Sequence, residues 1–87
     1  MDSYSIAWKR SATQELKRLP RATVGRILQA VEHLSTEPYP RGVRKLVGSE
    51  QTYRIRVGDY RIIYSVMAPA LLIEIIRIGH RRDVYNR

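Results

Sequence analysis

The chain has 87 residues, of which 16 are Lys or Arg and 8 are Asp or Glu, so its formal net charge at pH 7 is +8. This length gives room for one hydrophobic core, and we expect a single domain over residues 1–87. A hydrophobic fraction of 44% indicates a folded rather than a disordered chain. The excess of positive charge favours a polyanionic partner.

The composition also bears on the kind of chemistry. There is no Cys and there are only 2 His residues, so the chain cannot form a disulfide framework or a thiolate zinc site. We therefore expect no metal and no cofactor. The longest apolar run, residues 68–73, is too short to span a bilayer, and the N-terminus does not look like an export signal. We expect a cytoplasmic protein that does not bind membranes.

The N-terminal half predicts two helices. Residues 4–8 alternate weakly and favour a short strand. Apolar residues then recur at helical spacing, which predicts one helix over residues 9–19, ended by Pro20, and a second over residues 21–36, ended before Pro38. The two helices should form a hairpin with one apolar side.

The C-terminal half predicts strands. Residues 37–42 hold two Pro and one Gly and indicate a crossing loop. Residues 44–47 favour a short strand, and residues 51–57, 60–67 and 71–79 favour longer ones. The predicted fold class is α+β, with an N-terminal helical hairpin packed on a mainly antiparallel four-stranded sheet in the order β-α-α-β-β-β.

The two-residue loop 58–59 sets a register. Gly stands first in it, as a type II′ turn prefers, and such a turn pairs Arg56 with Arg61 and Ile55 with Ile62. Side-chain alternation then separates two faces. The apolar face, expected under the helices, comprises Tyr53, Ile55, Val57, Tyr60, Ile62 and Tyr64. The other face comprises Arg54, Arg56, Arg61, Ile63 and Ser65.

The second face and the C-terminal segment together indicate phosphate chemistry. Like charges directly opposite each other, as Arg56 and Arg61 are, destabilise a sheet unless an anion or a carboxylate relieves them. Past the last strand the chain delivers His80, Arg81, Arg82 and Tyr85. RNA carries its own nucleophile, so cleavage needs only in-line positioning, charge stabilisation and proton transfer. The alternative is an ordinary solvated sheet face.

Three segments resemble the RelE/ParE toxin superfamily, namely residues 44–48, 53–64 and 79–85, and the last one, which ends in Tyr, resembles the RelE branch. The resemblance implies the toxin of a type II toxin–antitoxin pair. Its implied activity is that of a ribosome-dependent mRNA endoribonuclease, an mRNA interferase that inhibits translation by metal-independent attack of the 2′-hydroxyl and leaves a cyclic phosphate. The implied partners are the ribosome, mRNA and an acidic RelB-like antitoxin, with DNA contacted only through the antitoxin complex.

The resemblance also implies roles for individual residues. Arg61 matches the arginine that stabilises the transition-state phosphate, Arg81 the one near the leaving oxygen, and Tyr85 the tyrosine beside the cut. Arg54 and Arg56 stand where the best-known RelE toxin has lysines. We thus expect the catalytic residues to be Arg61, Arg81, Tyr85 and His80, and the RNA-binding residues to be Arg54, Arg56, Lys45, Arg44 and Arg82.

The departure from lysine leaves the proton acceptor open. An arginine stays charged, so Arg56 can stabilise charge but is a poor base. The acceptor is then Tyr85 or His80; His80 has a pKa nearer neutrality, although it is equally well read as a polar residue that closes a strand. Two other functions stay open: a ParE-like inhibitor of DNA gyrase, which needs no RNA-cleaving residues, and a non-catalytic component that binds the antitoxin in a repressor complex.

Overall fold

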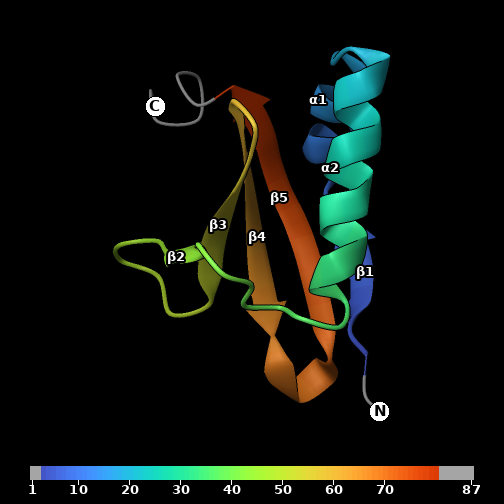
Figure 1. The fold of residues 1–87 in the computed structure, drawn as a ribbon. Coiled ribbons are helices and arrows are strands. Elements are labelled where there is room, and N and C mark those ends of the chain that lie inside the picture. Colours follow the sequence, from blue (N-terminus) through green and yellow to red (C-terminus); the bar gives the residue numbers. More distant parts are fainter. Residues whose placement is uncertain (1–2, 81–87) are drawn as a thin grey trace.

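The computed structural model describes residues 3–80, in which two helices lie together on one face of a sheet (Figure 1). The predicted α+β fold and helical hairpin are confirmed. In chain order the elements are β1 (Ser5–Trp8), α1 (Arg10–Lys17), α2 (Arg21–Leu34), β2 (Arg44–Lys45), β3 (Thr52–Val57), β4 (Tyr60–Met67), a short 3₁₀ helix (Ala68–Ala70) and β5 (Leu72–His80). Over the described range, no helix is long and apolar enough to cross a bilayer.

The sheet has five strands in the order β1-β5-β4-β3-β2, so the predicted count of four was too low. β1 runs parallel to β5, and every other pairing is antiparallel. The additional strand is the two-residue β2, which lies at the edge beside β3; the other edge strand, β1, is also short and lies beside β5. An edge strand needs only one neighbour, so short segments with weak sequence patterns can pair there.

The hydrophobic core lies between the helices and one face of the sheet. The helices contribute buried side chains at helical spacing, while the strands contribute alternate residues. The buried apolar residues are Ala12, Ile27, Val31, Leu34, Ile55, Ile62, Tyr64, Val66, Ile73, Ile75 and Ile78. Trp8 and Tyr60 pack against this cluster, as expected of core residues.

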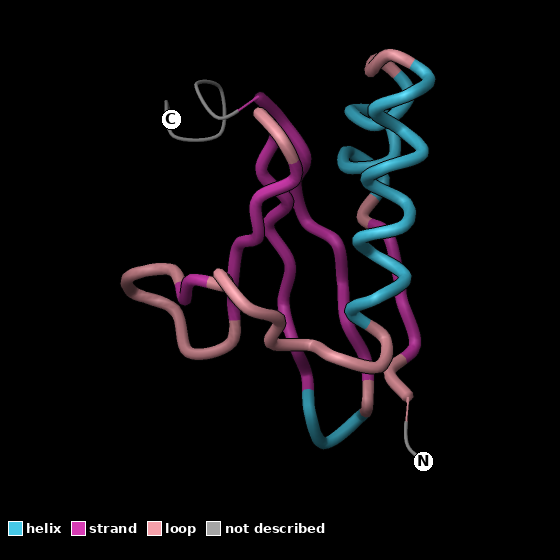
Figure 2. The backbone as a smooth tube through the Cα atoms, viewed as in Figure 1, coloured by secondary structure: helices cyan, strands magenta, loops and turns pink. Residues whose placement is uncertain are grey.

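The loop between α2 and β2 crosses the sheet, as Figure 2 shows, and Tyr64 anchors it. The Tyr64 side chain is fully buried, and its hydroxyl donates a hydrogen bond of 2.8 Å to the carbonyl oxygen of Pro38. Burial raises the pKa of the Tyr64 phenol well above its ordinary value, so the hydroxyl stays protonated and able to donate. This contact brings the following residues, Gly42 among them, to the edge of β3.

Candidate functional site

The β3–β4 hairpin has the predicted register. Arg56 lies opposite Arg61, Ile55 opposite Ile62, and the remaining pairs also follow the count outward from the turn. Gly58 has a φ of 61°, and among the described residues only Leu71 has a positive φ without being Gly, so Asp59 does not. This combination is that of a type II′ turn.

Arginine side chains hold the turn from both faces of the sheet. The Nε of Arg56 donates to the carbonyl oxygen of Gly58 at 3.2 Å. From the helix side, the guanidinium of Arg26 lies so close that a Cβ at Gly58 would meet its Nη2 at 3.2 Å. The positive φ favours Gly at position 58, and the Arg26 guanidinium would have to move by a few tenths of an ångström to admit a Cβ.

The sheet register brings arginines from different strands onto the face opposite the helices. Arg44 pairs with Arg54, and Arg56 with Arg61. Directly paired residues project to the same face, so these four side chains share one surface, which we call the arginine surface. A groove of about 340 Å³ lies on it. Its lining residues are Gly42, Arg44, Arg54, Ile55, Arg56 and Arg61.

The groove is a cationic site with partly shielded donors. Arg54 and Arg61 are partly buried, and the Nη1 atom of Arg61 is itself buried, whereas Arg44 and Arg56 are exposed. A guanidinium group presents donors in a planar fork that fits two oxygens of a phosphate. Partial burial lowers the local dielectric and strengthens such contacts. The arrangement can therefore bind a phosphate and stabilise added negative charge on it.

The predicted basic face is not uniform along the hairpin. Ser65, which we assigned to that face, is only 7% exposed. Its hydroxyl lies 3.4 Å from the hydroxyl of Thr52, the residue opposite it. The arginine surface is thus confined to the half of the hairpin near the turn.

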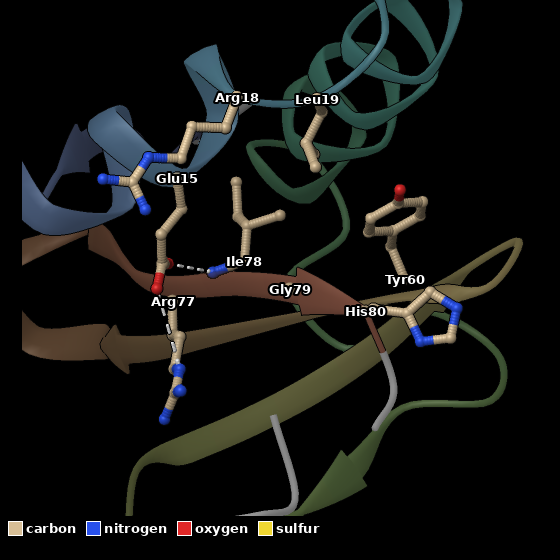
Figure 3. Close-up of a pocket in the computed structure, with 8 residues that line it drawn as sticks. All are labelled: Glu15, Arg18, Leu19, Tyr60, Arg77, Ile78, Gly79 and His80. Atoms are coloured by element: carbon tan, nitrogen blue, oxygen red, sulfur yellow. Dashed lines mark hydrogen bonds and ion pairs between the residues drawn. The ribbon is translucent and has the colours of Figure 1, made fainter. Parts of the chain in front are cut away.

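The structure does not bring His80 or Lys45 to the arginine surface. His80 lies opposite Tyr60, with ring centroids 5.7 Å apart, and Tyr60 packs against the core on the helix side (Figure 3). Lys45 lies opposite Tyr53 and so also projects to the helix side. The predicted residues Arg81, Arg82 and Tyr85 lie outside the described residues.

Sequence reasoning missed Arg77 and Gly42. Arg77 lies opposite Ile63 on β4, which places it on the face of the arginine surface. Gly42, from the crossing loop, lines the groove itself. Among residues 3–80, no group of three His, Asp or Glu side chains is arranged to hold a metal ion. The groups that meet at the groove are guanidinium groups.

Comparison with known proteins identifies the family. Residues 6–85 match the family of ParE toxins of type II toxin–antitoxin systems, parDE. The chain belongs to this family. The toxin is 31% identical to toxin RelG of Mycobacterium tuberculosis over 97% of its own length and 98% of RelG. It is 28% identical to the putative toxin RelE1 of Methanocaldococcus jannaschii, over 95% of this chain and 96% of RelE1.

A solved structure supports the same family assignment. In the archaeal RelE–RelB complex from Pyrococcus horikoshii OT3, the matching chain has a TM-score of 0.82 and 36% sequence identity. The match covers 91% of this toxin and 96% of that chain. The resemblance to the RelE/ParE superfamily that the sequence indicated is confirmed, and the toxin has the RelE-like fold.

Proposed function

We propose that this toxin is an mRNA endoribonuclease that cuts mRNA on the ribosome without a metal ion and so inhibits translation in the cytoplasm. One observation carries the proposal: four arginines from three strands line a single groove, and two of them face each other directly. Such a pair destabilises a sheet, and a phosphate bound between the two cations relieves the repulsion. The RelE-named relatives support the same activity.

The proposed reaction uses the nucleophile of the RNA. The 2′-hydroxyl gives its proton to a base and its oxygen forms a bond to the adjacent phosphorus. The bond from phosphorus to the 5′-oxygen breaks and that oxygen takes up a proton from solvent, which leaves a cyclic phosphate and a free 5′-hydroxyl. The phosphorane in between carries more negative charge than the ground state. Arg61 and Arg56, paired across the hairpin, are placed to donate hydrogen bonds to its non-bridging oxygens.

Proton transfer needs a group other than an arginine, because a guanidinium does not give up its proton near neutral pH. His80 faces Tyr60 on the helix side of the sheet, so we assign the acceptor role to Tyr85. General acid–base catalysis contributes about a hundred- to ten-thousandfold. We expect Tyr85→Phe to lose more than tenfold in single-turnover cleavage and His80→Gln to lose less. A larger loss in His80→Gln, with loss of the pH dependence near neutrality, would reverse the assignment.

We propose that an acidic RelB-like antitoxin controls the site by covering the arginine surface, with DNA bound only through the complex. The toxin in the Pyrococcus horikoshii structure is held by RelB. A net charge of +8 favours fast, electrostatically steered association with an acidic chain. A neighbouring gene that encodes a basic protein unable to bind the toxin would contradict this proposal.

A gyrase inhibitor is the second candidate, because the matching family is described by ParE. Purified toxin added to ribosomes programmed with mRNA should cut the message, and the Arg61→Ala variant should not. The same preparation should leave DNA supercoiling by gyrase unaffected. Inhibited supercoiling with intact mRNA would favour the ParE-like function, and antitoxin binding without either effect would favour a non-catalytic repressor component.

A further inference from the structure

We propose that Arg77 is a fifth phosphate-binding arginine of the same surface, and that Glu15 is the residue that positions it. The inference deepens the proposed function, since it takes RNA as the ligand. Arg77 and Glu15 form an ion pair of 3.7 Å and come from opposite ends of the chain. Neither was singled out by the sequence pattern.

Arg77 completes a row of residues across four strands. Arg44, Arg54, Ile63 and Arg77 lie side by side in neighbouring strands. Because neighbouring strands are about 4.8 Å apart, Arg77 stands roughly 10 Å from Arg54 along this row. The charged surface therefore extends past the groove as far as β5.

The next row shows where a ligand can approach. Arg61 lies opposite Gly79, which has no side chain. A Gly within a strand often marks a place where a ligand or another backbone comes close. Among the described residues, the next side chain on this face of β5 is that of Arg77. A nucleic-acid backbone that leaves the groove across Gly79 would meet Arg77 next.

Glu15 holds the end of β5 where the sheet lacks a neighbour. β1 pairs with β5 only as far as Ile75, and the last bond is from the Lys9 amide to the Ile75 carbonyl at 2.9 Å. Beyond it, the Ile78 amide donates to Oε1 of Glu15 at 2.8 Å. Figure 3 shows Glu15 reaching down from α1 to this bond, in the position that a further strand would occupy.

The same carboxylate orients the Arg77 side chain. Its Oε2 lies 3.7 Å from Nε of Arg77, the nitrogen nearest to the backbone, while the guanidinium extends away from the helices (Figure 3). The two side chains are 37% and 31% exposed, so the ion pair itself contributes little to stability. Its consequence is geometric, because it fixes Nε of Arg77 beside the edge of β5, while the strand register places Arg77 on the face that carries Arg61.

The first test compares Arg77→Ala with Arg10→Ala, which removes the same charge from an exposed position at the start of α1. The probe is a single-stranded 2′-O-methyl RNA, which lacks the nucleophile, and its affinity is measured by fluorescence anisotropy over a range of salt. Each phosphate contact contributes about 0.7 to the slope of log affinity against log salt. We expect the slope to fall by about 0.7 in Arg77→Ala and to stay unchanged in Arg10→Ala. Equal changes would overturn the proposal.

A second variant guards against misfolding. Arg77→Lys keeps the charge and should keep the wild-type slope, while affinity falls because the planar fork is lost. A slope as shallow as that of Arg77→Ala would overturn the assignment of a phosphate contact to this position.

The role of Glu15 is tested by a double-mutant cycle. Removal of the Glu15 carboxylate takes away a negative charge, which by itself would favour RNA binding. We nevertheless expect Glu15→Ala to bind the same probe about threefold more weakly, because the hydrogen bond at the end of the strand is lost. Glu15→Gln keeps one oxygen that can accept from Ile78 but puts an amide NH2 group where Oε2 faces Arg77, so it should restore binding only in part. In the Arg77→Ala background, Glu15→Ala should have no further effect. Tighter binding, or equal weakening in both backgrounds, would show that Glu15 does not act through Arg77.

These outcomes are independent of catalysis. If the wild-type toxin binds the probe with these differences but cuts no mRNA on ribosomes, the proposed function fails and the inference stands. If it cuts mRNA and the Arg77 and Arg10 variants bind alike, the inference fails and the proposed function stands.

Discussion

The two faces of the β3–β4 hairpin differ in burial and in charge. The Ile55–Ile62 pair is 7% and 0% exposed and belongs to the core, whereas the adjacent Arg56–Arg61 pair places two cations opposite each other at a groove. Burial of the first pair stabilises the fold, and repulsion within the second opposes it. One hairpin thus supports the fold with one face and offers a binding site with the other, so the effects of substitutions on stability and on activity should separate by face.

The largest effect on stability is expected on the helix side. Ile62→Ala leaves a cavity in a core where Ile62 is fully buried, and we expect a loss of roughly 3 kcal/mol in the free energy of unfolding. Urea denaturation of the purified toxin measures it. Any loss of toxicity should follow the loss of folded protein. A change below about 1 kcal/mol would mean that this face does not support the fold as described.

A smaller effect on stability is expected at Tyr64, which joins the core to the crossing loop by a hydrogen bond. Tyr64→Phe removes the hydrogen bond to Pro38 and should cost roughly 1 kcal/mol at neutral pH. Burial raises the pKa of Tyr64, so above about pH 10 the tyrosine ionises in the unfolded chain while it stays neutral in the folded one. Stability should therefore fall as the pH rises past 10, and less steeply in Tyr64→Phe. The free energy of unfolding is measured by denaturation at pH 8 and at pH 11. An equal loss between these pH values in the wild type and in Tyr64→Phe would contradict this account.

The smallest effect on stability is expected in α2, away from both faces of the β3–β4 hairpin. Gly25 lies within α2, is exposed, and has no atom near the position of an added Cβ. Gly25→Ala should raise the free energy of unfolding by roughly 0.5–1 kcal/mol, because Gly is a poor helix former, and should leave mRNA cleavage unchanged. Thermal unfolding together with the cleavage assay checks both. Reduced cleavage in this more stable variant would place a functional contact on α2.

The strand pairs differ in how far their register could be predicted from the sequence. The register of the hairpin followed from a two-residue turn, because pairing is counted outward from it without interruption. The pairing of β4 with β5 could not be counted in this way, because the register shifts between Ile63 and Tyr64, where β5 has one extra residue, Ile76. A count from the turn that joins β4 to β5 would put Arg77 on the helix side, whereas the bulge turns it to the arginine surface.

Contacts between residues far apart in the sequence could not be predicted either. Glu15 and Ile78 are 63 residues apart, and nothing in the helical pattern of α1 marks Glu15 as a partner of β5. For His80, the residue type and its place after the last predicted strand favoured a catalytic role, but its register with Tyr60 directs it to the helix side. The residue types indicated phosphate chemistry, but only the strand register shows which side chains lie on the same face of the sheet.

The most direct test of the account is the Arg61→Ala variant, which removes one of the two facing cations. It should abolish cleavage of mRNA on programmed ribosomes, while its thermal unfolding midpoint is no lower than that of the wild type because repulsion with Arg56 is relieved. It should still bind the antitoxin, because Arg44, Arg54 and Arg56 remain on the surface that the antitoxin covers. Loss of the folded state in Arg61→Ala, or undiminished cleavage by a folded variant, would contradict the claim that this face of the hairpin is a catalytic rather than a structural surface.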